Sequence, residues 1–491
     1  MTFTEISPLT NSGLEANFKS FPAFFKLQNL GLPLLCSAAK IADADVCRRL
    51  LDEGADLDAT DSGTTALHYA AMNKRHGEAL VELLVSWGLR VDQKDVLDEE
   101  PIHFALRAKN FQVAKLLLEL KYTADGEQRR NNLLHFCIKE QNLSAAKDVF
   151  EFDKTMLQER GKYGKTAFHL AAEFSDLQMC KWLVGQGANP KELDAKNKAS
   201  AMHFAAFNMA HGADLTLFLV SFRLNMNHRD RFDETPLHYA LKTGNLAAAE
   251  QLLVFGASLD VLRSNENLLL YSVVANRLPS ASFVYQKKPH LLHGTDDTAR
   301  NALHFAAEFS DLETCRWLLD QGVDLHAVEN NGLSVLHFTG YNFPFGSELV
   351  EFLVSRGLDV NGRESEAHRT PLHCALEYGN TGVAAELVRL GARLDVRLAE
   401  MDLLHFCVDS ASMAGARFVH QHCPELVRAG KDALHCAVRK ANLDLCRWLV
   451  ESGADPHALA DNGASLLDYF DPGDLQNECK SYLSSLGVCR S

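Results

Sequence analysis

The sequence lacks the features that mark several common classes of protein. No stretch approaches the 18 or more apolar residues needed to span a bilayer, and the first residues, Met-Thr-Phe-Thr-Glu, lack the basic start of a secretory signal. Basic charge is also scarce, because 49 Lys and Arg against 64 Asp and Glu give a net charge of −15, which repels phosphate backbones and anionic lipid. We therefore expect a soluble protein of the cytoplasm, with the nucleus as a second location, that neither binds nucleic acid nor inserts into a membrane.

Motifs of catalysis and of metal binding are missing as well. There is no GxxxxGK[ST], no GxGxxG after a strand, no HExxH and no GxSxG, so the sequence offers no phosphate cradle, metalloprotease helix or nucleophile elbow. The 12 cysteines include no CxxC pair, which argues against structural zinc and against a redox dithiol. We predict a protein that is not an enzyme and that has no cofactor and no metal.

What the sequence does contain is a repeat. An apolar residue followed by histidine recurs at His68, His103, His135, His169, His203, His238, His304, His337, His373, His405 and His435. Cys36, Leu270 and Asp468 fall in the same register, so thirteen intervals separate residues 36 and 468, at roughly 33 residues each. This period predicts a solenoid of about fourteen repeats.

The residues around each register position indicate where helices begin. The position three before it holds an N-cap residue at Thr65, Asn132, Thr166, Ser200, Thr235, Asn267, Asn301, Ser334, Thr370, Asp402, Asp432 and Ser465. Glu100 is the exception. Pro101, Pro236 and Pro371 follow, at the first helical position, where proline is tolerated. A second apolar stripe and a Gly-Ala-Asp loop come next, so the predicted unit is helix, turn, helix and loop.

Three segments carry a resemblance to a known family. Thr-Pro-Leu-His-Tyr-Ala at 235–240, Thr-Pro-Leu-His-Cys-Ala at 370–375 and Gly-Ala-Asp-Leu-Asp-Ala at 54–59 resemble the ankyrin repeat. The resemblance covers nearly all of 30–491 and implies an all-α solenoid of helix-turn-helix units with short hairpin loops. Residues 1–29 are predicted to cover the first repeat, with Phe21-Pro-Ala-Phe-Phe as an apolar plug, 30–464 to form the array and 465–491 to cap it.

A longer period lies over the repeat. His169 and His304 are 135 residues apart, and Ala-Glu-Phe-Ser-Asp-Leu occurs at both 172–177 and 307–312, so blocks of four repeats were multiplied. In each block one helix-to-helix turn is two residues longer, at Asn73, Asn208 and Asn342. Another repeat lacks the Gly-Ala-Asp loop, around Lys154, Lys287 and Cys423.

Histidines in a row suggest a metal site, but spacing argues against it. Packed helices lie roughly 10 Å apart, whereas zinc needs nitrogen ligands about 2 Å away. We predict instead that the histidines bond backbone groups of their own and the next repeat. The cysteines alternate with small apolar residues between repeats, so most are predicted to be buried, with Cys489 the accessible thiol.

The binding surface is inferred from the resemblance, which implies that partners contact the loop tips and the exposed side of each first helix. The candidate partner-binding residues are Phe174, Phe207, Phe309, Tyr341 and Tyr378 on the helices and Tyr163 and Phe232 at loop tips. The alternative is that the rings pack sideways between repeats. The loop tips at 162–165 and 228–232 are basic, as a solvated edge or as a site for an acidic segment. Asn361 resembles loop asparagines that become hydroxylated in some family members.

The sequence is compatible with three hypotheses about function. The leading one is a monomeric scaffold or adaptor that binds partner proteins on the concave face. The rival is a cytoplasmic inhibitor that masks a basic segment of a transcription factor; the net charge of −15 suits it, although one peptide needs fewer than fourteen repeats. A secreted, host-directed effector is the third, and only the source organism would decide it.

Overall fold

The computed structural model describes residues 32–121, 132–263, 265–398, 401–429, 431–460, 463–470 and 478–490. The contacts between Cα atoms divide the chain into two units, the first comprising Met1–Ala240 with Ala247–Ala257 and the second Leu241–Leu246 with Ser258–Ser491. Each unit is a stack of helix pairs. The predicted N-terminal extension at 1–29, with its plug at Phe21, lies outside the described residues.

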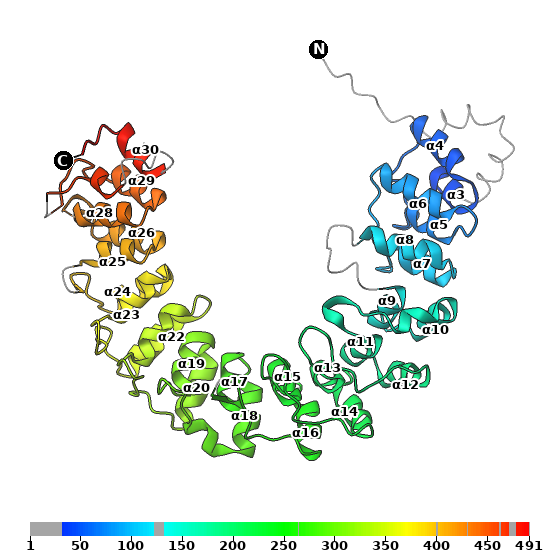
Figure 1. The fold of residues 1–491 in the computed structure, drawn as a ribbon, viewed down its shortest axis with the longest axis horizontal. Coiled ribbons are helices and arrows are strands. Elements are labelled where there is room, and N and C mark those ends of the chain that lie inside the picture. The colour runs from blue at the N-terminus through cyan, green and yellow to red at the C-terminus, as the bar shows by residue number, and fades with distance from the viewer. Residues whose placement is uncertain are drawn as a thin grey trace, which may run out of the picture. The chain divides into compact units, whose positions relative to one another are not determined.

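In the first unit the two helices of each repeat lie side by side and pack on the neighbouring repeat (Figure 1). The helices are α3 (Leu34–Ile41), α4 (Ala44–Asp52), α5 (Ala66–Met72), α6 (Gly77–Ser86), α7 (Pro101–Arg107), α8 (Phe111–Lys121), α9 (Leu133–Lys139), α10 (Leu143–Phe152), η2 (Lys154–Leu157), η3 (Lys162–Gly164), α11 (Ala167–Phe174), α12 (Leu177–Gly185), α13 (Ala201–Phe207) and α14 (Gly212–Val220). The next two helices are α15 (Pro236–Thr243) and α16 (Leu246–Val254), and residues of both units occur in each of them.

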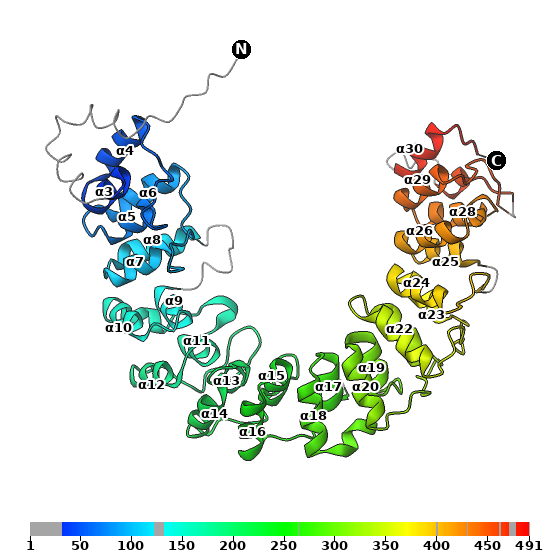
Figure 2. The ribbon, with the colours of Figure 1, turned by 180° about the vertical axis from the view of Figure 1, so that it is seen from behind.

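The second unit repeats the arrangement, as the reverse view also shows (Figure 2). Its elements are β1 (Leu262–Arg263), β2 (Glu266–Asn267), α17 (Leu268–Val274), α18 (Leu278–Lys287), η4 (Pro289–His293), α19 (Ala302–Phe309), α20 (Leu312–Asp320), α21 (Val335–Phe338), η5 (Thr339–Tyr341), α22 (Gly346–Ser355), α23 (Pro371–Glu377), α24 (Thr381–Arg389), α25 (Leu403–Asp409), α26 (Met413–His422), α27 (Glu425–Ala429), α28 (Lys431–Arg439), α29 (Leu443–Glu451), η6 (Leu466–Tyr469) and α30 (Glu478–Ser485). The two strands pair antiparallel, Leu262 with Asn267 and Arg263 with Glu266. The predicted all-α repeat fold is therefore confirmed.

Helix starts follow the predicted register, because every register residue from Cys36 to Asp468 lies in the first helix of a pair. In α11 the Thr166 hydroxyl accepts the His169 N–H at 3.3 Å, and the Thr166 N–H donates to His169 Nδ1 at 3.1 Å. This reciprocal capping box satisfies two backbone donors that a helix start otherwise leaves without partners. Pro101 and Pro371 occupy the first helical positions of α7 and α23, as predicted.

Two details of the helix starts differ from the sequence-based expectation. Glu100, the exception to the N-cap pattern, does cap α7: its side chain accepts the N–H of His103, while its own N–H donates to His103 Nδ1 at 3.0 Å. A carboxylate in this position also interacts favourably with the positive end of the helix dipole. Asp432 was expected to precede a helix, but α28 begins at Lys431, one residue earlier.

Four register histidines, His68, His169, His203 and His337, bond a backbone carbonyl of the segment that leads into the next repeat, as predicted, whereas the buried Nε2 atoms of His135, His304 and His373 have no hydrogen-bond partner in the described part of the chain. His203 Nδ1 accepts the Ser200 N–H at 3.2 Å, and its Nε2 lies 3.2 Å from the Glu234 carbonyl at the start of the next repeat. Since Nδ1 accepts, Nε2 carries the proton and donates. Burial lowers the pKa of His203 to about 4. Within the described ranges, no group of three His, Cys, Asp or Glu side chains is gathered so that it could hold a metal ion.

The asparagines of the longer turns are a second set of connections, which the sequence did not reveal. Asn208 is buried, and its Nδ2 donates to the carbonyls of Ala172 at 3.1 Å and Ser175 at 2.9 Å in the preceding repeat. Asn73 and Asn342 make the corresponding pairs of bonds. These bonds satisfy carbonyls at the C-terminal end of the preceding first helix, which have no partner within that helix.

Short helices replace the missing Gly-Ala-Asp loops. The segments after α10, α18 and α26 form η2, η4 and α27, so these joints are helical turns. Cys47, Cys180, Cys315 and Cys446 are buried and Cys489 is exposed, which confirms the predicted cysteine pattern. In the part of the chain that the structure describes, no helix is long and apolar enough to cross a membrane.

Candidate protein-binding site

Four of the five predicted helix aromatics are exposed at the end of a first helix. Phe174, Phe207 and Phe309 end α11, α13 and α19, and Tyr378 follows α23; their exposed fractions are 38%, 42%, 43% and 51%. The helices that carry them are otherwise buried, so each ring is held on a rigid support. Exposed rings on rigid elements are the composition that interface hot spots favour. Their role in binding stays a prediction.

Tyr341 differs from the other four. It is half-buried, and its ring lies 4.4 Å from the ring of Tyr378 in the next repeat and 5.9 Å from Phe338. Burial raises the pKa of Tyr341 well above its ordinary value. For this residue the contacts fit the alternative interpretation, because Tyr341 packs between repeats and supports the exposed Tyr378.

The two loop-tip aromatics are also exposed. Tyr163 has a left-handed backbone, with φ of 61°, and its carbonyl accepts the N–H of Lys196 at 3.1 Å, so consecutive loop tips are joined. Gly164 makes this approach possible, because a Cβ there would lie 2.3 Å from the Cβ of Ala195. Phe232 lies at another tip, with its N–H bonded to Asp230 Oδ1 at 2.9 Å.

Charged pairs surround the rings of the first unit. Lys165, before α11, reaches along the helix to Glu173 with an Nζ–Oε2 distance of 2.5 Å, and both side chains are largely buried. Lys139, at the end of α9, places its Nζ 5.8 Å from the ring centroid of Phe174. This separation permits a cation–π interaction. Lys165 lies beside another ring, with its Nζ 4.5 Å from the ring centroid of Phe204.

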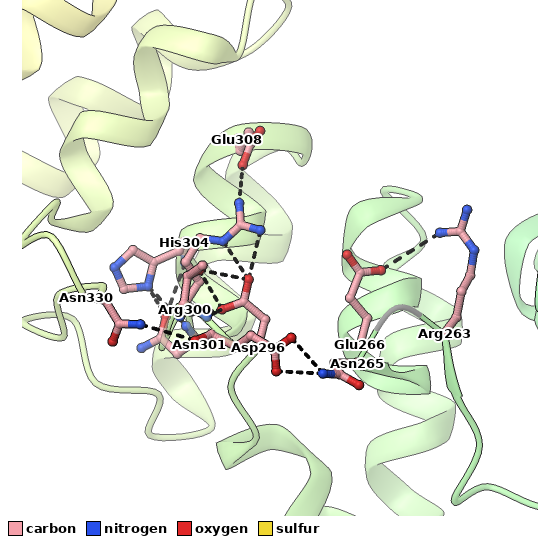
Figure 3. Close-up of polar contacts among 11 residues, drawn as sticks. Arg263, Asn265, Glu266, Asp296, Arg300, Asn301, His304, Glu308 and Asn330 are labelled. Atoms are coloured by element: carbon pink, nitrogen blue, oxygen red, sulfur yellow. Dashed lines mark hydrogen bonds and ion pairs between the residues drawn. The ribbon is translucent and has the colours of Figure 1, made fainter.

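In the second unit the corresponding position is a denser ionic cluster (Figure 3). Arg300 lies between two carboxylates, with its Nη1 3.2 Å from Glu308 Oε2 and its Nε 2.9 Å from Asp296 Oδ2. Its guanidinium also lies 4.4 Å from the ring centroid of Phe305. Glu266 and Arg263 face each other from the paired strands of the neighbouring repeat, 4.0 Å apart.

The carboxylates of this cluster differ in how strongly they hold protons. Burial raises the pKa of Glu308, with further contributions from Glu266 and Asp296, although Arg300 acts in the opposite direction. The pKa of Glu266 is raised for the same main reason. Burial also acts on Asp296, but hydrogen bonds from the backbone of Arg300 and from Thr298 outweigh it and lower that pKa. Glu266 and Glu308 are therefore the carboxylates that an added positive charge would stabilise most.

These charged residues were not identified from the sequence as part of the site, although their spacing in the repeat could have indicated them. Positions four before and four after the register histidine carry opposite charges in Lys165 and Glu173, in Arg300 and Glu308, in Arg369 and Glu377, and in reversed order in Glu99 and Arg107. Each pair spans the exposed side of one first helix. In three of the pairs the acidic residue directly precedes an exposed ring, at Phe174, Phe309 and Tyr378.

A polar hollow of about 340 Å³ lies elsewhere in the first unit, between α7 and α10. Ion pairs bridge charged groups at this hollow, Lys109 with Asp148 at 2.9 Å and Arg107 with Glu99 at 2.6 Å. None of the predicted aromatic residues lines it.

Comparison of the sequence with models of known protein families identifies the family to which these helix pairs belong. Residues 14–95, 134–222, 287–364, 303–398 and 345–460 match the family described as ankyrin repeats (3 copies), and residues 209–253 match ankyrin repeats (many copies). The chain belongs to the ankyrin repeat family. The resemblance inferred from the three sequence segments is thereby confirmed, and ankyrin repeats are protein–protein interaction domains.

Individual relatives share the ankyrin repeats over part of their length. The chain is 25% identical to putative palmitoyltransferase ZDHHC13 of Danio rerio over 242 residues, 49% of this chain and 31% of the relative. It is 24% identical to transient receptor potential cation channel subfamily A member 1 of Homo sapiens over 354 residues, 67% and 30% of the two chains. It is 27% identical to B-cell lymphoma 3 protein of Homo sapiens over 234 residues, 46% and 45%. The chain thus spans less than half the length of each of these relatives.

Proposed function

We propose that this ankyrin repeat chain is a non-catalytic scaffold or adaptor that binds other proteins, as a monomer, through the ends of the first helices and the loop tips of each unit. The observation that carries the proposal is the exposure of rings at the ends of first helices, Phe174 and Phe207 in the first unit and Phe309 and Tyr378 in the second. Apolar rings cost free energy while they face water, so burial against a partner is favourable. Charged pairs beside the rings would set which partners fit.

The test uses the tagged full-length chain to capture partners from its native cells, with quantitative mass spectrometry. Phe309→Ala and Tyr378→Ala should each weaken capture by roughly 2 kcal/mol, about thirtyfold, without lowering the thermal midpoint by more than a couple of degrees. Phe343→Ala, which removes an exposed ring that is not one of these four, is the matched control and should change neither. Unchanged capture by both variants, or loss of folding without loss of capture, would refute this assignment of the rings.

A second candidate is an inhibitor that masks a basic segment of a transcription factor. The ionic cluster of the second unit supports it, because the raised pKa values of Glu266 and Glu308 mean that a bound cation would stabilise their charged forms. A lysine- and arginine-rich peptide should then bind more weakly to Glu266→Gln and Glu308→Gln, and binding to the parent chain should release protons wherever these carboxylates are partly protonated. Equal affinity in the variants and the parent chain would eliminate this candidate.

We also propose a reducing compartment, the cytoplasm, because all 12 cysteines are free thiols. Titration of thiols in denatured protein from its native cells should find them all reactive. Disulfide-linked peptides in the same material would contradict this location.

A further inference from the structure

Three lysines of the first unit lie beside two exposed rings, and a fourth, Lys165, lies 4.5 Å from the buried ring of Phe204. We define the basic patch as Lys139, Lys162, Lys165 and Lys196 together with Tyr163 and Phe174. Lys162 and Lys196 place their Nζ atoms 5.1 Å and 4.4 Å from the ring centroid of Tyr163. Lys165 lies before α11 and Lys139 ends α9, so three successive repeats supply the patch.

In the described part of the chain, ion pairs involve only some of the charges in and beside the basic patch. Glu173 pairs with Lys165, and the neighbouring Glu192 pairs with Arg160 at 2.7 Å. Among the described residues, no carboxylate lies within ion-pair distance of Lys139. Burial lowers the pKa of Lys139, and the charges of Lys165 and Lys162 lower it further, although Glu173 acts against them. The patch therefore holds like charges close together, which costs free energy that a bound anion would recover.

The backbone holds this arrangement in place. The Lys196 N–H donates to the Tyr163 carbonyl at 3.1 Å, and the Ala195 N–H donates to the Gly164 carbonyl at 3.2 Å. These two bonds place Lys196 of one loop tip beside Tyr163 of the previous one. A ligand that needs both groups would therefore find them already in position.

The second unit provides an internal comparison, since four-repeat duplication places equivalent residues about 135 positions later. The features shared by the two copies are a basic residue, an acidic residue and a ring, at Lys165, Glu173 and Phe174 in one copy and Arg300, Glu308 and Phe309 in the other. The other three cations are absent from the second copy, where Val274, Asp297 and Asn330 replace Lys139, Lys162 and Lys196. The packing of the repeat therefore does not require these three lysines.

We propose that the basic patch binds an acidic segment of a partner protein, in which carboxylates contact Lys139 and Lys196 and an intervening apolar side chain covers Phe174. This inference rests on the proposed binding function and names the chemistry of one partner. Ammonium groups supply the charge complement, and the exposed ring supplies the apolar contact.

A protein segment suits the basic patch better than a long polyanion does. The whole chain carries a net charge of −15, so nucleic acid or an anionic membrane that extended beyond the patch would be repelled by the remaining surface. A short peptide can contact Lys139 and Lys196 without extending over the acidic surface beyond the patch. The patch also pairs its charges with a phenylalanine ring, which favours a ligand with apolar side chains between its acids.

The test measures fluorescence anisotropy of labelled twelve-residue peptides titrated with the full chain. One peptide alternates glutamate with leucine and phenylalanine, a second has glutamine in place of glutamate, and a third has lysine. The glutamate peptide should bind at least about tenfold more tightly than the other two, and its affinity should fall with added salt. Equal binding of the glutamate and glutamine peptides would overturn the proposal.

Paired variants locate the site. The double variant Lys139→Gln with Lys196→Gln should weaken binding of the glutamate peptide by about tenfold. Lys147→Gln with Lys181→Gln changes the net charge equally at exposed positions on α10 and α12, and should leave affinity within about twofold. Circular dichroism verifies that both variants fold. An equal loss in both pairs would overturn the proposal, since it would show only the effect of overall charge.

Two further measurements separate other outcomes. Single-stranded DNA or phosphatidylserine vesicles that bind more tightly than the glutamate peptide, with the same loss in Lys139→Gln, would overturn the proposal in favour of a general polyanion site. Normal partner capture by the lysine variants but not by Phe309→Ala would refute this inference while leaving the proposed function intact. Loss of peptide binding in the lysine variants, with capture unaffected by Phe309→Ala and Tyr378→Ala, would support it and refute the role of those rings.

Discussion

Neutral histidines at the helix starts should make the stability of this protein depend on pH between about 6.5 and 5. Burial lowers the pKa from 6.5 to about 4 in five of them, His135, His169, His203, His304 and His373. Geometry acts in the same direction, because Nδ1 accepts a backbone N–H and has no room for a proton. As pH falls below 6.5, the unfolded chain binds protons that the folded chain cannot bind until about pH 4. The contribution of these neutral histidines to the free energy of unfolding is therefore fully present above about pH 6.5 and is lost as the pH falls towards 4.

The magnitude follows from the linkage between proton binding and folding. At pH 5.5 a histidine with these two pKa values destabilises the fold by about 1.4 kcal/mol, and five of them by about 7 kcal/mol. That is comparable with the entire stability of an ordinary domain. Most carboxylates begin to bind protons only below this range, while Glu266 and Glu308, whose pKa values are raised, offset part of the loss.

The assay is urea unfolding followed by circular dichroism from pH 8 to 5.5, with hydrogen exchange to resolve the repeats. His304→Gln should be less stable than the parent at pH 7.5, by about 1–3 kcal/mol, because the substitution alters a buried hydrogen-bonded group. Its free energy of unfolding should also depend less steeply on pH, because its unfolded chain has one histidine fewer to take up a proton. His326→Gln removes an exposed histidine and should match the parent in both respects. An unfolding midpoint that stays constant from pH 7.5 to 5.5 would refute the reasoning.

Three other predictions concern the connections between repeats. Asn208→Ala should lower the free energy of unfolding by about 2–3 kcal/mol, because two buried carbonyls lose their donor. Urea titration measures this loss, and a change below about 0.5 kcal/mol would contradict the prediction. Gly164→Ala should lower the thermal midpoint and local hydrogen-exchange protection of the loop tips, since the new Cβ would collide with Ala195; an unchanged midpoint would show that the tip adjusts freely. A chain that ends at residue 330 should remain helical by circular dichroism, because each repeat packs on its neighbours; a random-coil spectrum would contradict the modular fold.

The repeat itself was predictable from the sequence, because helix starts depend on local chemistry. A side-chain oxygen three residues before the register histidine caps the helix through bonds within four residues, as at Thr166 and His169. The position of Pro371 and the burial of Cys180 follow from the same register. Glu100 was treated as an exception to the N-cap pattern because glutamate is an uncommon N-cap, yet it caps α7 from the expected position.

The composition of the candidate site depended on tertiary structure, because residues of neighbouring repeats meet across about 33 positions of sequence. Phe174 and Tyr341 occupy equivalent kinds of position, yet one ring is exposed and the other packs on Tyr378, a residue of the next repeat. Lys139 and Lys196 looked like isolated charges until stacking placed them beside the rings of Phe174 and Tyr163. Short-range hydrogen bonds thus determined the repeat from sequence alone, whereas the stacking of repeats decided which rings and charges share a surface.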